Sequence, residues 1–366
     1  MKRNVKPHRF PYEWTLKDAV FTKDKGKVFS CFACGGGSTM GYKLAGFDVI
    51  GCNEIDPKMM EAYITNHCPK YAYLEPIQTF KLRKDLPDEL YDLDILDGSP
   101  PCSSFSMAGN REKDWGKDKV FREGQSMQIL DTLFFDFIDL AKELKPKVVV
   151  AENVKGLLLG AAKSYVIQIY KEFDKAGYYV QHFLLDASKM GVPQKRERVF
   201  FIALRKDIAG PFLYSADMFR SIPRIEMDFK EKPIVYGDIQ TNNGPSISEF
   251  YKTIWEQRKP GDLDFSCVNS RVRNKPNTGF GQNFIYKDKV VGTLTAKADC
   301  MVKFDYPQYL SNEERCKIGT FPLDYDFSPS NNPYLIGMSV PPVMTAQIAS
   351  NIYDQWLSEL SKEEAA

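Results

Sequence analysis

The sequence lacks the features of a secreted or membrane protein. It begins with the basic stretch Met1-Lys2-Arg3-Asn4, which no apolar segment follows, so a signal peptide is not expected. No window is apolar over the length needed to span a bilayer. We therefore expect a cytoplasmic protein with no membrane association.

Residues that commonly bind metal ions are also scarce. There are three histidines and eight cysteines among 366 residues. Cys31 and Cys34 form a Cys-x-x-Cys pair, but a zinc site needs a second pair of ligands, and no histidine stands at ligand spacing. The cysteines do not group like a disulfide framework, so we expect reduced thiols and no metal site.

An excess of charge of either sign is missing too. Lys and Arg total 49 and Asp and Glu total 48, which gives a formal net charge of +1. This balance neither supports nor excludes a nucleic-acid partner, which would need a local basic face. The apolar fraction of 43% is enough for a large core, in one domain with a sizeable insertion or in two domains.

The sequence does contain apolar, strand-like runs that alternate with segments of helical periodicity. Such alternation predicts an α/β fold with a mixed, mostly parallel sheet that is covered on both faces. The expected strands are 27–33, 48–53, 93–96, 147–151, 178–185 and 198–204, and the expected helices are 38–45, 57–66, 125–144, 161–176, 311–317 and 343–360.

The alternation stops between residues 206 and 304. This stretch is rich in Pro, Gly, Asn and aromatic residues, and it predicts a small, irregular, β-rich module without a helix ladder. The expected organisation is an N-terminal tail (1–24), a first domain (25–205), the module (206–304) and a return to the first domain (305–366). Basic residues of the module are Arg258, Lys259, Arg271, Arg273 and Lys275, the last three in a stretch, 269–283, that we expect to be an exposed loop.

A glycine-rich turn follows the first expected strand. Gly35, Gly36 and Gly37 would let the backbone approach a ligand closely, with a helix N-terminus behind it. Glu54 ends the next strand, where a carboxylate can hold ribose hydroxyls. Together these residues indicate a nucleoside site, although a glycine turn without a ligand fits them as well.

A cysteine stands at the end of the strand 93–96. Pro100 and Pro101 cannot donate ladder hydrogen bonds, so the strand must stop before Cys102. A thiol at the carboxyl end of a strand can be reached and activated as a nucleophile. The alternative is a buried structural cysteine.

Charged residues stand at the edges of two further strands. Glu152 ends the apolar run 147–151, where an ionised carboxylate is rare without a role or a partner. Arg196 and Arg198 are spaced by two, so extended backbone would point them the same way. A helix-capping glutamate and a solvated charged turn are the alternatives.

In this order and setting, the residues resemble the cytosine-5 DNA methyltransferase family. The resemblance covers most of residues 27–205 and 305–360. The family's segments correspond to Phe32-Ala33-Cys34-Gly35-Gly36, Gly98-Ser99-Pro100-Pro101-Cys102-Ser103-Ser104-Phe105-Ser106, Glu152-Asn153-Val154, Gln194 with Arg196 and Arg198, Leu310 to Glu314 with Phe321-Pro322, and Gly337-Met338-Ser339-Val340-Pro341-Pro342.

The resemblance implies a Rossmann-like, S-adenosylmethionine-dependent methyltransferase domain, with 206–304 as a target-recognition domain. It implies that Cys102 attacks carbon 6 of a cytosine flipped out of double-stranded DNA, while Glu152 holds the ring and Arg198, supported by Arg196, holds the 2-oxygen. The methyl group would pass to carbon 5, leaving S-adenosylhomocysteine. The expected cofactor-binding residues are Phe32, Cys34, Gly35, Gly36, Glu54, Ile55, Glu75, Ile77, Pro100, Ser339 and Val340.

Three positions depart from the family pattern. Cys34 replaces a glycine, Pro76 stands where an Asp usually faces the adenine, and Met338 replaces an Asn beside the cofactor. Glu75 is a candidate substitute for the missing Asp. These departures leave the predicted nucleophile and its partners in place.

Three other readings compete with DNA methylation. The tRNA-methylating branch of the family carries a Cys-Phe-Thr tripeptide that is absent from 206–304. A catalytically silent relative would be expected to lose Pro-Cys or Glu-Asn-Val, and a small-molecule methyltransferase would not need the insertion. We expect a monomer acting on DNA, with a cognate restriction endonuclease as a partner in the same system but not in a stable complex. The target sequence stays open.

Overall fold

The computed structural model describes residues 8–101, 118–119, 128–129, 132–215, 221–274, 276 and 281–364. The predicted nucleophile Cys102, most of the loop after it and Lys275 lie outside the described residues.

The centre of the protein is a seven-stranded sheet with strand order β3-β2-β1-β4-β7-β9-β8. Neighbouring strands run parallel except at β9, which is antiparallel to both β7 and β8. The expectation of a mixed, mostly parallel sheet is confirmed. The strands are β1 (Lys27–Cys31), β2 (Asp48–Glu54), β3 (Tyr71–Leu74), β4 (Ile95–Gly98), β7 (Val148–Val154), β8 (Tyr178–Asp186) and β9 (Glu197–Arg205).

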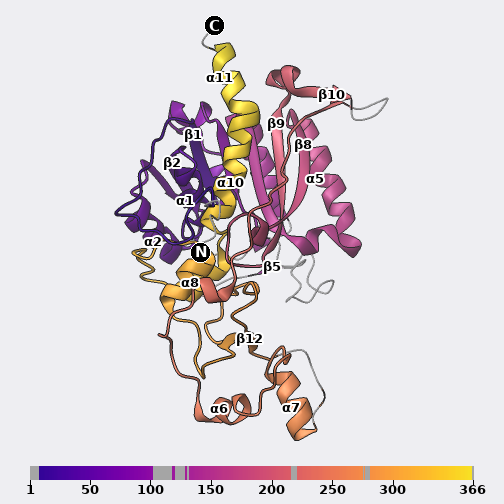
Figure 1. Ribbon diagram of the computed structural model, residues 1–366. Coiled ribbons are helices and arrows are strands. Elements are labelled where there is room, and N and C mark those ends of the chain that lie inside the picture. Colours follow the sequence, from indigo (N-terminus) through magenta and orange to yellow (C-terminus); the bar gives the residue numbers. More distant parts are fainter. Residues whose placement is uncertain are drawn as a thin grey trace, which may run out of the picture.

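Helices cover both faces of this sheet (Figure 1). One buried apolar cluster joins α4 and α5 to the strands, and a second joins α1 and α10 to the opposite face. Parallel strands are buried on both sides in this way because crossover helices return the chain. The helices of this domain are α1 (Gly37–Leu44), α2 (Pro57–His67), α3 (Ile77–Phe80), α4 (Leu133–Leu144), α5 (Lys163–Lys175), α8 (Asn312–Gly319), α9 (Asn332–Met338), α10 (Pro342–Ile352) and α11 (Ser358–Glu364).

The expected helix 125–144 is wrong in its first part. α4 begins at Leu133, and residues 128–129 form β6 (Gln128–Ile129), which pairs with β5 (Asp118–Lys119). The buried stripe of α4 starts with Leu133 and Phe134, so helical packing against the sheet begins only there. The C-terminal helix, expected at 343–360, is one helical run in which a π-helical turn (Tyr353–Leu357) joins α10 to α11.

The insertion contains a small core of its own. Ile247, Phe265, Val268 and Phe284 belong to a buried cluster separate from those of the sheet, and this module lies apart from the sheet in Figure 1. It contains α6 (Glu249–Trp255), α7 (Phe265–Arg273) and the parallel pair of β12 (Asn283–Ile285) with β13 (Met301–Lys303). The chain before it carries a hairpin of β10 (Leu213–Ser215) and β11 (Ser221–Pro223).

The two helices of this module were not expected from the sequence. Arg271 and Arg273, predicted to lie in a loop, occupy the last turn of α7. Asp264 caps this helix by accepting a hydrogen bond from the backbone N–H of Cys267. Only Phe265, Ser266 and Val268 of α7 are buried, so its apolar stripe is short and its periodicity is weak.

Residues 8–24, expected to form a tail, lie against the C-terminal part of the chain. The Trp14 indole donates a hydrogen bond to Thr320 O at 2.9 Å, and Trp14 O accepts one from Leu323 N. Trp14 is 9% exposed and belongs to a buried cluster with Phe321 and Tyr325. Across the described residues, no helix has both the length and the apolar character needed to cross a membrane.

Candidate active site

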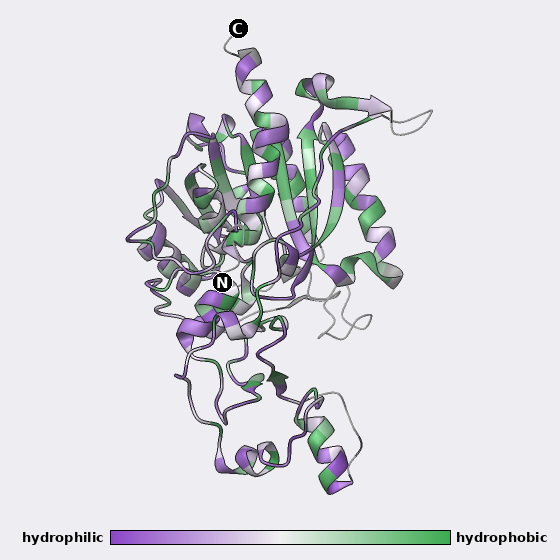
Figure 2. Cartoon of the chain, in the orientation of Figure 1, coloured by the Kyte–Doolittle hydropathy of each residue, from purple (hydrophilic) through white to green (hydrophobic). Residues whose placement is uncertain are grey.

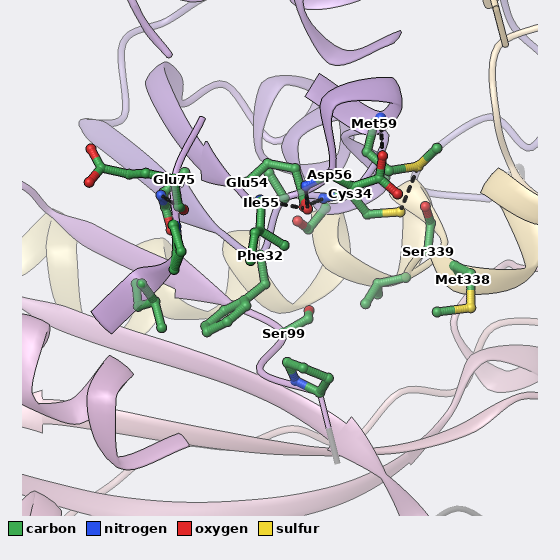
Figure 3. Close-up of a pocket in the computed structure, with 18 of the residues that line it drawn as sticks. Phe32, Cys34, Glu54, Ile55, Asp56, Met59, Glu75, Ser99, Met338 and Ser339 are labelled. Carbon is green, nitrogen blue, oxygen red and sulfur yellow. Dashed lines mark hydrogen bonds between the residues drawn. The ribbon is translucent and has the colours of Figure 1, made fainter. Parts of the chain in front are cut away.

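A cavity opens at the carboxyl ends of the central parallel strands, where open α/β sheets place their ligands. It encloses about 940 Å³ of empty space, part of which is open to solvent. It is lined by Phe32, Ala33, Cys34, Gly37, Ser38, Asn53, Glu54, Ile55, Asp56, Met59, Glu75, Pro76, Ile77, Ser99, Pro101, Tyr334, Met338, Ser339 and Val340 (Figure 3).

The turn after β1 is shaped by left-handed backbone. Phe32, Cys34 and Gly36 have φ values of 51°, 49° and 81°. At Gly36 a side chain would collide with the ring of His67, so glycine is required there. Cys34, which replaces a glycine of the family pattern, adopts this conformation with its Sγ 3.6 Å from Met59 Sδ. Burial, followed by the charge of Glu54, raises the Cys34 pKa to about 12, so the thiol stays protonated.

The side chain of Glu54 fixes the shape of the turn after β1. Its carboxylate accepts backbone hydrogen bonds from Cys34 N at 2.7 Å, Ile55 N at 2.8 Å and Asp56 N at 2.9 Å. The side chain is buried, and this burial raises its pKa. Glu54 therefore both holds the turn and presents a carboxylate to the cavity (Figure 3).

Glu75 is engaged elsewhere. Its Oε1 lies 2.8 Å from Arg83 Nη1, and its carboxylate points away from Phe32 and Glu54 (Figure 3). Pro76 and Ile77 line the cavity beside it. Together with Phe32, they offer an apolar surface suited to a flat aromatic ring. Because the Glu75 carboxylate is paired with Arg83, it does not supply a polar contact for such a ring in this arrangement.

The loop after α9 closes another side of the cavity. Met338, Ser339 and Val340 line it, and Gly37 approaches so closely that a Cβ there would lie 2.5 Å from Val340 O. The Ser339 hydroxyl is buried and has no hydrogen-bond partner among the described residues. An orphaned hydroxyl on a cavity wall is a natural contact for a polar ligand.

Most of the predicted cofactor residues therefore meet at one cavity. Of that set, Gly35, Gly36 and Pro100 shape the surrounding turns without lining it. The sequence analysis did not assign Ser38, Met59 or Ser99 to the site. Ser38 carried a usable signal, because it is the second residue of the helix that the glycine turn opens.

Glu152 and Arg198 form an ion pair beside this region. They lie on the adjacent antiparallel strands β7 and β9, with Arg198 Nε 2.9 Å from Glu152 Oε1. Both side chains are largely buried, at 14% and 16% exposure. A partly desolvated pair of this kind strongly orients both groups.

The residue after Glu152 connects the pair to the Pro-Pro segment. Asn153 Nδ2 donates a hydrogen bond to Pro100 O at 3.1 Å, while its Oδ1 accepts one from Val154 N. The end of β7 is thereby joined to the segment that leads into Cys102, which itself lies outside the described residues.

Arg196 contacts the backbone of two other segments. Its Nη1 donates to Leu294 O at 3.2 Å and its Nη2 to Gly337 O at 3.1 Å. Burial, followed by the charge of Arg198, lowers the Arg196 pKa to about 9, so the guanidinium remains charged at neutral pH. Gln194 accepts from Leu294 N at 2.9 Å. These two residues connect the start of β9 to the end of the 206–304 module and to α9.

A buried ion pair connects the 206–304 module to α8. Lys303 Nζ lies 3.0 Å from Glu314 Oε1, with side-chain exposures of 1% and 0%. Lys303 also donates to Thr241 O and Asn243 O, while Glu314 accepts from Thr241 N. The Lys303–Glu314 pair thus connects three segments, which are the chain at Thr241 and Asn243, β13 and helix α8.

The basic residues of the module divide into two groups. Arg271 is held by both carboxylate oxygens of Asp262 and by Gln257 O, and Arg258 by Phe304 O and the Trp255 ring. Arg273 and Lys259 are exposed, with the Arg273 guanidinium 5.3 Å from the ring centre of Phe250.

This sheet, with a ligand-sized cavity at its carboxyl edge, defines an S-adenosylmethionine-dependent methyltransferase fold. The family model of the C-5 cytosine-specific DNA methylase matches residues 26–354, and the chain belongs to that family.

Individual relatives agree with this membership. Type II methyltransferase M.FnuDI of Fusobacterium nucleatum is 38% identical over 182 residues, which are 50% of this chain and 48% of the relative. The matched part thus spans about half the length of that relative. M.NgoFVII of Neisseria gonorrhoeae is 27% identical over 90% of this chain and 87% of its own length.

Solved structures share the fold. A structure described as a DNA modification methyltransferase encoded within an E. coli prophage has a TM-score of 0.60 at 19% identity and covers 90% of this chain and 99% of its own. Spodoptera frugiperda DNMT2 has a TM-score of 0.57 at 18% identity and covers 89% and 99%.

Proposed function

We propose that the protein is a DNA (cytosine-5-)-methyltransferase that uses Cys102 as its nucleophile. The observation that carries the proposal is the junction at the end of β7. There Glu152 is paired with Arg198, and the adjacent Asn153 is bonded to Pro100, two residues before Cys102. A nucleophile, a carboxylate and a guanidinium are the groups that covalent catalysis on a cytosine ring needs.

The residues around the cavity fit S-adenosylmethionine. Phe32, Pro76 and Ile77 would hold the adenine, Glu54 the ribose hydroxyls, and the orphaned Ser339 hydroxyl the amino-acid part. When bound, this cofactor supplies an electrophilic methyl group on a sulfonium and leaves as S-adenosylhomocysteine. No metal ion takes part in the proposed reaction.

The protein's own groups make carbon 5 of cytosine reactive. The Cys102 thiolate forms a bond to carbon 6, and the electrons of the 5,6 double bond shift toward the ring carbonyl and nitrogen 3. Glu152 accepts a hydrogen bond from the exocyclic amine and shares a proton with nitrogen 3, while Arg198 donates to the 2-oxygen, so negative charge that builds on the ring is stabilised. After carbon 5 is methylated, a base such as a water molecule takes the carbon 5 proton, and the electrons of that carbon–hydrogen bond restore the 5,6 double bond. The carbon–sulfur bond breaks at the same time, and its electrons return to Cys102 as the thiolate.

Arg196 takes a supporting part in this proposal. Its contacts with Leu294 O and Gly337 O would hold the start of β9 so that Arg198 stays opposite Glu152. Because a cytosine in a duplex cannot be reached on both faces, the target base is flipped out of double-stranded DNA. The insertion 206–304 sets the target sequence, and the protein acts as a monomer.

The test is methylation of DNA in cells that express the protein. Bisulfite sequencing should reveal methylated cytosine at one short recurring site. Cys102→Ser should abolish this signal, whereas Cys68→Ser, a change at an exposed cysteine on α2's C-terminus, should preserve it. DNA carrying 5-fluorocytosine should trap the wild type covalently, because fluorine cannot leave as the proton does. Trapping of Cys102→Ser at the wild-type level, or methylation of tRNA in place of DNA, would refute the proposal.

A further inference from the structure

A buried carboxylate lies behind the cavity wall. Asp97, on β4, is 4% exposed. Its Oδ2 accepts hydrogen bonds from Ser30 Oγ and Ser38 Oγ, each at 2.8 Å, and its Oδ1 accepts one from Tyr42 Oη at 3.1 Å. Both oxygens are therefore bound by hydroxyl groups, which come from β1 and α1.

The Asp97 carboxylate carries its negative charge in a buried position, where removal from water disfavours the charged form. No cation among the described residues pairs with Asp97. Burial raises its pKa from 3.8 to about 6, and the nearby charge of Glu152 adds to the rise. Cys31 and Tyr63 also face this charge, and both are buried groups with raised pKa values. A buried carboxylate without a cation is costly even when hydroxyl groups donate to it, so its retention calls for a role.

Ser38 connects Asp97 to the cavity. It is a lining residue, and its hydroxyl proton is committed to Asp97. The lone pairs of the Ser38 oxygen are then left to face a ligand, so the hydroxyl acts as a hydrogen-bond acceptor. Ser30 donates to the same oxygen of Asp97 at the same distance but does not line the cavity.

We propose that the Ser38–Asp97 pair is an acceptor site for the cationic amino group of the cofactor's amino-acid part, with Asp97 positioning and polarising Ser38. The inference rests on the proposed function, because it takes S-adenosylmethionine as the ligand. A donor bearing a positive charge matches both the orientation of the hydroxyl and the negative charge directly behind it.

The test compares two probes by calorimetry. S-adenosylhomocysteine carries the amino group, and 5′-methylthioadenosine lacks the whole amino-acid part. Ser38→Ala and Asp97→Asn should each weaken S-adenosylhomocysteine binding about 10-fold, the size expected for one hydrogen bond to a charged group, and leave 5′-methylthioadenosine within about 2-fold. Ser30→Ala is the matched control and should change neither dissociation constant.

The outcomes separate this inference from the proposed function. If Ser38→Ala weakens both probes equally, or neither, the acceptor site is wrong while cofactor binding stands. If Ser30→Ala weakens S-adenosylhomocysteine as much as Ser38→Ala, the network is only structural and the inference fails. Wild type that binds neither probe would refute the proposed function and this inference with it.

Discussion

Arg198 and Glu152 are paired across adjacent antiparallel strands, with 2.9 Å between Arg198 Nε and Glu152 Oε1. The two groups that we propose to hold opposite sides of the cytosine ring are thus already oriented by each other. Preorganisation of this kind lowers the cost of stabilising charge in a transition state.

Removal of Arg198 should lower the rate of methyl transfer more than it lowers stability. Arg198→Ala is expected to reduce kcat by about 10²- to 10³-fold, the usual loss when one charge-stabilising donor is removed. Arg205→Ala, at the opposite end of β9, should leave kcat nearly unchanged. Single-turnover kinetics with saturating DNA provide the measurement, and a kcat within about 3-fold of wild type for Arg198→Ala would contradict the assigned role.

Glu54 should be intolerant even of glutamine. Both of its carboxylate oxygens accept backbone N–H groups, so an amide NH₂ would face a donor whichever way it is turned. Glu54→Gln should weaken S-adenosylmethionine binding by about 1.5–3 kcal/mol, the contribution of a hydrogen bond to a charged group. Calorimetry gives the dissociation constant, with the exposed Glu61→Gln as control. Unaltered affinity would show that Glu54 has no part in the site.

The pair Lys303–Glu314 should matter greatly to stability. Lys303→Met leaves Glu314 buried without its cation and should lower the free energy of unfolding by about 3–5 kcal/mol in urea titrations. Lys287→Met, which removes a surface pair with Asp305, should cost less than about 1 kcal/mol. If the two substitutions lowered the free energy of unfolding equally, the buried pair would not hold the module to α8.

Asp97 should make stability depend on pH. Its folded-state pKa of about 6 lies above the ordinary value of 3.8, so the folded state keeps a proton that the unfolded chain releases. The contribution of Asp97 to the free energy of unfolding is therefore fully present below about pH 4 and is lost as the pH rises from about 4 to about 6. Asp97→Asn escapes this loss and should be more stable than wild type at pH 7.5 by up to about 3 kcal/mol, and no more stable near pH 4. A constant difference across this window would refute the assignment.

Arg273 and Arg271 should differ in their effects on DNA. Arg273 is exposed, so Arg273→Ala should weaken DNA binding and reduce the slope of log affinity against log salt by about 1 if it meets a phosphate. Arg271 is clamped by Asp262, so Arg271→Ala should mainly destabilise the module. Fluorescence anisotropy at several salt concentrations, together with thermal unfolding, distinguishes these effects. An unchanged affinity for Arg273→Ala would exclude that residue from the interface.

The parts of the fold that follow from local patterns were predictable. Apolar runs with turn residues after them identified the glycine turn and every strand of the sheet except the short edge strand β3, and the segments Glu152-Asn153-Val154 and Gln194 to Arg198 fitted a family pattern. The role of Asp97 was not predictable, because its partners Ser30, Ser38 and Tyr42 lie 67, 59 and 55 residues away. α7 was missed because only a short stripe of it is buried, so tertiary contacts decide its structure where periodicity is weak.

The bond between the Trp14 indole and Thr320 O has a consequence for synthesis of the protein. These residues are 306 positions apart, so a ribosome must release nearly the whole chain before the segment around Trp14 meets its partner. The apolar side chains of strand β1 and helix α1 are likewise covered only after α10 has been synthesised. The nascent chain therefore keeps apolar surface exposed through most of translation, and slower synthesis at low temperature, or chaperone capacity, should govern the yield of folded protein.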